Sequence, residues 1–173
     1  MERPKRSKEK VFDPAFVTHS LEVKGAVNHP LRLTVEELGA MELTEVRDVN
    51  MICGSGRNEG FIESYRGVRL TEVLNRADIV MRVHDSPNYL YVTAISSDGR
   101  WALFSYQELF NTSVGEQVIV IIEKNGQPLG DDEGKIALIS ANDTRSGQRK
   151  LRYLKSVEVH EHLWNEGSES RAE

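Results

Sequence analysis

Short runs in which apolar and polar residues alternate recur along most of the chain, separated by turn residues. Residues 17–27 alternate as far as Gly25, and residues 42–52 alternate less regularly, so both runs predict half-buried strands. Residues 89–95 are rich in residues that favour strands. Further strands are predicted at residues 101–104, 118–123, 135–140 and 152–159. The chain is therefore expected to be rich in strands.

Short helices are predicted between these strands. Thr34 with Glu37 and Ser105 with Glu108 have the spacing of capping boxes that open helices, and residues 70–77 have apolar positions at helical spacing. The regular crossover helices of a doubly wound fold are missing from the pattern. The fold class predicted is α+β, with mixed twisted β-sheets and short helices. We expect one domain at residues 18–160, an N-terminal extension at 1–17 and a disordered tail at 161–173.

Composition narrows the class of protein. The 173 residues include 39% hydrophobic and 28% charged residues and one cysteine, which is typical of a soluble domain without a disulfide framework. A net charge of −5 without a basic stripe argues against nucleic acid as a partner, whereas an anionic small molecule needs only a local cluster of cations. No apolar run is long enough to span a membrane. We expect a cytoplasmic protein as written; an exported protein whose signal peptide had been removed would look the same.

The single cysteine lies in the sequence NMICGSGR at residues 50–57. Glycines allow a sharp bend and the close approach of a ligand, and Arg57 adds positive potential that favours a thiolate or an anion. The predicted strand 42–52 delivers Cys53 to its end, where ligand-binding groups are often found. Two interpretations follow for Cys53: a soft metal ligand or reactive thiol, and a small buried residue that serves packing.

A second candidate is the basic segment RSGQRK at residues 145–150. Its cations gather around a glycine in a chain of opposite net charge, which favours an anion or nearby carboxylates as compensation. A basic hairpin turn is the simpler interpretation. We expect three other features to be structural: His160 and His162 as a solvated strand end, residues 131–133 as a solvated turn, and Trp101 as part of the core.

The order and spacing of several short blocks is more specific than any one of them. They are LEVKG at 21–25, LTVEEL at 33–38, the Cys53 loop, YRGVRL at 65–70, SDG at 97–99, NGQPL at 125–129 and LKSVEV at 154–159. This series resembles the molybdopterin-binding domain of the sulfite oxidase family over residues 18–160. The resemblance implies molybdopterin, the molybdenum cofactor, as the cofactor.

The resemblance also implies roles for individual residues. In that family the cysteine at the position of Cys53 gives molybdenum its protein thiolate, and the other ligands are dithiolene sulfurs and oxygens. The segment corresponding to residues 145–150 anchors the pterin phosphate. The implied catalytic residues are Cys53 and Arg57, the metal ligand is Cys53, and the implied cofactor-binding residues are Gly54, Ser55, Ser146, Arg149 and Lys150.

Two functions from different classes remain open. The retained Cys53 favours an oxidoreductase that passes electrons to a separate electron-transfer protein, since the chain carries no haem motif and no cysteine cluster. Leu138 stands where the resemblance implies an arginine near the substrate, which favours a non-catalytic module that binds a pterin or another anionic small molecule as a sensor or accessory subunit. The sequence leaves the substrate open.

Overall fold

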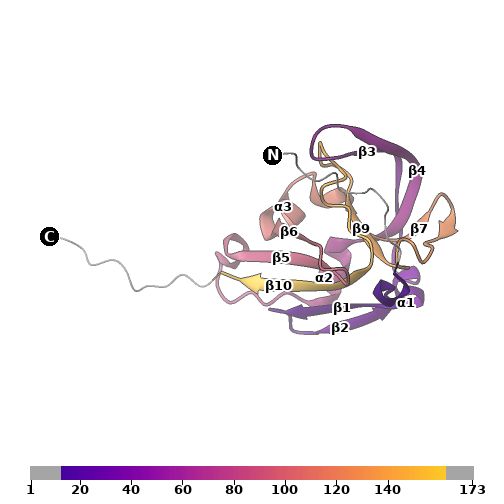
Figure 1. Cartoon of the computed structure of the whole chain (residues 1–173). Coiled ribbons are helices and arrows are strands. Elements are labelled where there is room, and N and C mark those ends of the chain that lie inside the picture. The colour runs from indigo at the N-terminus through magenta and orange to yellow at the C-terminus, as the bar shows by residue number, and fades with distance from the viewer. Residues whose placement is uncertain (1–12, 163–173) are drawn as a thin grey trace, which may run out of the picture.

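Two five-stranded sheets form the framework of the protein. The structure is a computed structural model and describes residues 13–162. The first sheet has the order β2-β1-β10-β5-β6, and the second has the order β3-β4-β7-β8, with β9 also paired to β7. Figure 1 shows β3 and β4 reaching away from the first sheet.

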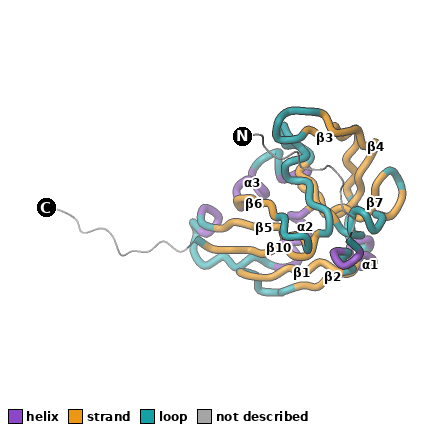
Figure 2. The backbone as a smooth tube through the Cα atoms, viewed as in Figure 1, coloured by secondary structure: helices purple, strands orange, loops and turns teal. Residues whose placement is uncertain are grey.

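The first sheet consists of β1 (Ser20–Gly25), β2 (Leu31–Thr34), β5 (Leu90–Ser96), β6 (Trp101–Ser105) and β10 (Leu154–Glu161). The second consists of β3 (Thr44–Ile52), β4 (Asn58–Arg69), β7 (Val118–Lys124), β8 (Gln127–Pro128) and β9 (Ala137–Ser140). The helices are α1 (Val35–Gly39), α2 (Leu70–Ala77) and α3 (Tyr106–Asn111), with 3-10 turns at Pro14–Phe16, Ser86–Asn88 and Gly115–Gln117. Figure 2 shows that strands and loops dominate.

Pairing in the first sheet is antiparallel except at one place. β10 runs parallel to β1 on one side and antiparallel to β5 on the other. Gly25 of β1 lies against the backbone of Val159, where a Cβ would come within 2.1 Å of the carbonyl oxygen, and its φ is +97°. Only glycine fits at this point of the parallel pair.

The helices begin where the sequence predicts. At α1, the Thr34 hydroxyl accepts from the Glu37 N–H at 3.2 Å, and the Glu37 carboxylate accepts from the Thr34 N–H at 2.8 Å, which confirms the capping box. The Ser105 hydroxyl accepts from the N–H of Glu108 at 3.0 Å and caps α3. Helix α2 begins at Leu70 and buries its apolar face, the predicted helix 70–77.

The core has two parts. The larger is shared by the first sheet, α2 and inward residues of β7, while the smaller lies among β3, β4, β7 and β9 around Tyr65. Neighbouring residues of β7 contribute to both: Val120 belongs to the larger cluster and Ile119 and Ile121 to the smaller. Strand β7 therefore joins the second sheet to the rest of the domain, which explains its continuous apolar sequence.

The structure confirms the α+β class with mixed sheets and short helices. The longest strand, β4, was not predicted, because its outer half carries polar residues and Gly60 and is exposed in the ribbon with β3. Most of the predicted extension 1–17 and tail 161–173 lies outside the described residues. Within residues 13–162, no helix is both long and apolar enough to cross a membrane.

Candidate functional site

Cys53 directly follows β3, at the end of a strand as predicted. Its N–H donates to the Arg57 carbonyl at 2.9 Å, and its own carbonyl accepts from the Gly56 N–H at 2.8 Å. Gly56 has a φ of +84°, a conformation that glycine adopts without strain. These contacts close a tight turn between β3 and β4 and fix the backbone on both sides of the thiol.

The Cys53 thiol is half-exposed and has a local hydrogen-bond partner. Its Sγ lies 2.9 Å from the Ser55 Oγ, and this hydrogen bond lowers the pKa of the thiol below its ordinary value. Arg57 is exposed and forms an ion pair with Glu59 at 3.2 Å. The Ser55 hydroxyl therefore favours the thiolate form of Cys53. The Arg57 guanidinium pairs with Glu59 instead.

Residues 145–148 of the basic segment pack directly on this turn. The Ser146 hydroxyl donates to the Asn50 carbonyl at 2.7 Å and accepts from the Ile52 N–H at 3.3 Å. The Gly147 N–H donates to the Ile52 carbonyl at 2.9 Å. Two candidates separated by more than 90 positions in the sequence are thus brought together, and Ser146 contacts the end of β3.

Neighbouring side chains extend this contact over Gly54. The Arg145 guanidinium donates to the Gly54 carbonyl. Gln148 lies over Gly54 so closely that a Cβ on Gly54 would come within 2.3 Å of the Gln148 Nε2. Gln148 was not among the predicted site residues, because a glutamine in a basic run gives no signal of its own.

The Arg149 side chain forms ion pairs with two carboxylates. Its Nε and one terminal nitrogen form a bidentate pair with Asp143 at 2.7 and 2.6 Å, and it also donates to Glu108 at 2.8 Å. The guanidinium lies 4.3 Å from the ring centroid of Phe104. The Asp143 and Glu108 contacts raise the pKa of Arg149, against the effect of its burial. In this arrangement Arg149 ties the loop 143–149 to α3 and the first sheet.

Lys150 forms a buried ion pair with Glu133, and Lys124 approaches the same carboxylate at 3.2 Å. Glu133 is 4% exposed, so the prediction of a solvated turn at residues 131–133 is wrong for this residue. Burial alone would raise the pKa of Glu133, but the two lysines outweigh it and lower the pKa to about 2. The Lys150 ammonium also lies 5.2 Å from the ring centroid of Tyr65.

A pocket of about 370 Å³ adjoins the segment 147–151. Trp101, at the start of β6, lines it and is 63% exposed, so the prediction that Trp101 belongs to the core is wrong. Both faces of β6 carry apolar residues, and Ala102 and Phe104 take the buried face. Gln148, which lies over Gly54 of the Cys53 turn, also lines this pocket. Its lining consists of Gly99, Arg100, Trp101, Gly147, Gln148, Lys150 and Leu151.

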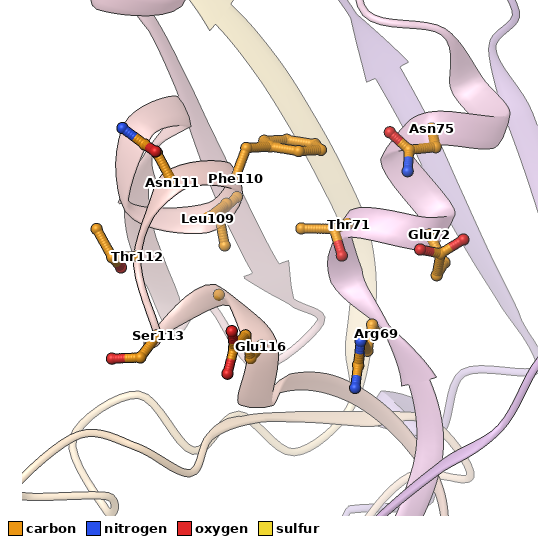
Figure 3. A pocket seen from close by; sticks show the side chains of 11 residues that line it. Arg69, Thr71, Glu72, Asn75, Leu109, Phe110, Asn111, Thr112, Ser113 and Glu116 are labelled. Carbon is orange, nitrogen blue, oxygen red and sulfur yellow. The ribbon is translucent and has the colours of Figure 1, made fainter.

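A larger pocket of about 500 Å³ lies between α2 and the α3 region and is lined by residues 69–75 and 109–116. Figure 3 shows Thr71 and Phe110 projecting toward the space between the two helices. Arg69, the residue directly before α2, lines this pocket and makes no side-chain capping hydrogen bond to the helix.

Two other residues considered from the sequence, Leu138 and His160, pack within the fold. Leu138 is completely buried in β9. His160 contacts the Thr93 hydroxyl at 2.8 Å and stacks on Tyr91. Among residues 13–162, no three His, Cys, Asp or Glu side chains form a group that could hold a metal ion. A metal at Cys53 would need its other ligands from a cofactor.

Comparison with known families shows which family the chain belongs to. Residues 8–166 match the family described as the oxidoreductase molybdopterin binding domain. The chain belongs to this family. The resemblance to the molybdopterin-binding domain of the sulfite oxidase family is therefore confirmed, and molybdopterin is the cofactor of the family.

Solved structures agree at the level of the fold. The sulfane dehydrogenase SoxCD from Paracoccus pantotrophus superposes with a TM-score of 0.58 at 16% sequence identity, over 82% of this chain. The chain spans 38% of that protein's length. A search of curated proteins found no significant match. At this identity the likeness to SoxCD shows the molybdopterin-binding-domain fold alone.

The residues around Cys53 suit the molybdenum of this family's cofactor better than its phosphate. A half-exposed thiol with a lowered pKa suits molybdenum, because a soft anionic sulfur complements the dithiolene sulfurs of the pterin. Arg149 and Lys150 are already neutralised by carboxylates. A phosphate beside the 370 Å³ pocket would instead meet Arg100 and the backbone around Gly147.

Proposed function

We propose that this chain is an oxidoreductase domain that binds molybdopterin and provides Cys53 as the protein ligand to molybdenum. One observation carries the proposal: the only cysteine of the chain lies at the end of β3, with its thiol hydrogen-bonded to the Ser55 hydroxyl and its turn contacted by residues 145–148. The bound cofactor would supply the two-electron redox chemistry. The residues around it place the thiolate and hold the ligand.

Each neighbouring residue has a role in this proposal. The Ser55 hydroxyl donates to the thiolate, which stabilises the charged form of Cys53. Trp101 offers an exposed aromatic face at the 370 Å³ pocket, suited to a planar ring, and Arg100 offers a cation for an anionic group there. Because one cysteine cannot bind an iron–sulfur cluster, electrons would leave this domain to another redox centre.

Metal analysis of protein made in a host that synthesises molybdopterin tests this proposal. We expect about one molybdenum per chain in the wild type and a loss of molybdenum in Cys53→Ser, because a serine oxygen is a hard, weakly acidic ligand. The melting temperature should change little, since the thiol is half-exposed. Ser113→Ala, an exposed change on the far pocket, is the control and should retain the metal.

Equal molybdenum in the wild type and Cys53→Ser would contradict the ligand role. A chain in which Cys53 serves packing would instead lose about 1–3 kcal/mol of stability on the same substitution.

A second function is a non-catalytic module that binds a pterin or another anionic small molecule. The observation that favours it is Leu138, completely buried in β9, which stands where the family resemblance implies an arginine near the substrate. Purified wild-type protein that retains a fluorescent pterin without molybdenum would support this module over the enzyme.

A further inference from the structure

We infer that Ser146 is a positioning residue that fixes the end of β3 and thereby the place of the Cys53 thiol. The inference rests on the proposed function, in which Cys53 binds molybdenum. Ser146 is 3% exposed, and its hydroxyl hydrogen-bonds to Asn50 and Ile52. Both of these hydrogen bonds are to the backbone of β3, the strand that ends at the thiol.

The pairing of β3 with β4 is irregular at the point that Ser146 contacts. Asn50 pairs with Phe61, while Ile52 pairs with Asn58, so the register shifts between the two β3 residues. Such a bulge leaves backbone groups without ladder partners. The Ser146 hydroxyl donates to the Asn50 carbonyl at 2.7 Å and accepts from the Ile52 N–H at 3.3 Å, so one buried hydroxyl bridges both sides of the shift.

Gly147 adds a second contact that depends on its lack of a side chain. Its N–H donates to the Ile52 carbonyl at 2.9 Å. A Cβ on Gly147 would come within 2.9 Å of that same carbonyl oxygen, closer than Cβ atoms approach a backbone oxygen. Both polar groups of Ile52 are thus held by adjacent residues of one segment, and Ile52 is the residue before Cys53.

This arrangement gives the basic segment a role different from phosphate anchoring. Its hydroxyl and its glycine bind the strand, and the Arg145 guanidinium binds the Gly54 carbonyl on the other side of the thiol. The backbone is therefore held immediately before and after Cys53. Removing the Ser146 hydroxyl would leave the Asn50 carbonyl and the Ile52 N–H without this partner at the bulge and loosen the thiol relative to the rest of the site.

The test uses amide hydrogen exchange and thiol alkylation on the full 173-residue chain without added cofactor. In Ser146→Ala, the Ile52 amide should exchange about tenfold faster or more, as expected for a lost hydrogen bond. The rate of Cys53 alkylation by iodoacetamide should change by about threefold or more, while amides in α2 keep their protection. Ser146→Thr retains the hydroxyl and should restore both rates toward the wild type.

Two controls separate positioning from general loss of stability. Ser96→Ala removes another buried serine hydroxyl, which has no hydrogen-bond partner, and should leave the Ile52 exchange and Cys53 alkylation unchanged. Gly147→Ala disrupts the same contact independently and should reproduce the effect of Ser146→Ala. Gly39→Ala is its control, since a Cβ there meets only Ile122 at an ordinary 3.7 Å.

Unchanged Ile52 exchange or unchanged Cys53 alkylation in both Ser146→Ala and Gly147→Ala would overturn the inference. This result is independent of metal. If Cys53→Ser retained its molybdenum while the exchange and alkylation effects appeared, the proposed ligand role of Cys53 would fail and the positioning role of Ser146 would stand.

Discussion

Replacement of Glu133 by glutamine tests the buried ion pair beside the candidate site. The Glu133 and Lys150 side chains are 6% and 9% exposed, and the change leaves the Lys150 charge without its buried partner. Loss of one partner from such a pair costs about 3–5 kcal/mol. The fall in the pKa of Glu133 from 4.5 to about 2 corresponds to about 3 kcal/mol, which agrees with the lower end of this range.

The effect should depend on pH in a defined direction. Because folding lowers the pKa of Glu133, its contribution is fully present above its ordinary pKa and is lost as the pH falls from about 4.5 toward 2. Burial lowers the pKa of Lys150, and the Glu133 charge opposes this, so Lys150 should lose its proton more readily in the variant. Glu133→Gln should therefore differ most from the wild type near pH 7 and converge with it in acid.

Urea unfolding at pH 7 should show Glu133→Gln less stable by about 3 kcal/mol, which is a fall of about 6–12 °C in melting temperature for a domain of this size. The control is Glu59→Gln, which removes an exposed ion pair with Arg57 and should cost about 0–1 kcal/mol. Equal losses in the two variants, or a difference from the wild type that persists unchanged at pH 3, would refute the assignment of a buried, ionised Glu133.

Two further predictions concern the framework. Arg149→Lys should lower the free energy of unfolding by about 2 kcal/mol in urea titrations, because a lysine cannot bind Asp143 bidentately and contact Glu108 as well. Wild-type stability in this variant would show that the planar guanidinium geometry is unimportant. Gly25→Ala should destabilise by about 2–4 kcal/mol, because its φ of +97° and the 2.1 Å approach to the Val159 carbonyl oxygen both exclude a side chain; wild-type melting behaviour would contradict this.

Sequence patterns predicted the helices and strands correctly where the local pattern agrees with the packing of the fold. The capping residues Thr34 and Ser105 fix helix starts through contacts three residues apart, so their pattern is sufficient. Strand β4 escaped prediction because its outer half is stabilised by pairing with β3 in a ribbon rather than by burial. Trp101 was misplaced because β6 is apolar on both faces, and alternation alone cannot choose between them.

The candidate site was predictable only in part. Local composition indicated the Cys53 turn and the segment around Ser146, and the structure brings them into contact. The partners of the cations could not be read from the chain, because Arg149 meets Glu108 and Lys150 meets Glu133 through long-range packing. A cluster of positive charge in sequence therefore indicates that compensation is needed, and does not tell whether a ligand or the protein provides it.

The position of β10 has a consequence for synthesis on the ribosome. This strand, near the C-terminal end of the described residues, lies in the middle of the first sheet, between β1 from the other end and β5. Strands β1 and β2 can pair early as a hairpin, and so can β5 and β6, but nothing joins these two hairpins into one sheet until residues 154–161 have been translated. The nascent chain would thus expose apolar strand faces for most of its elongation, and chaperones that bind emerging chains would meet them.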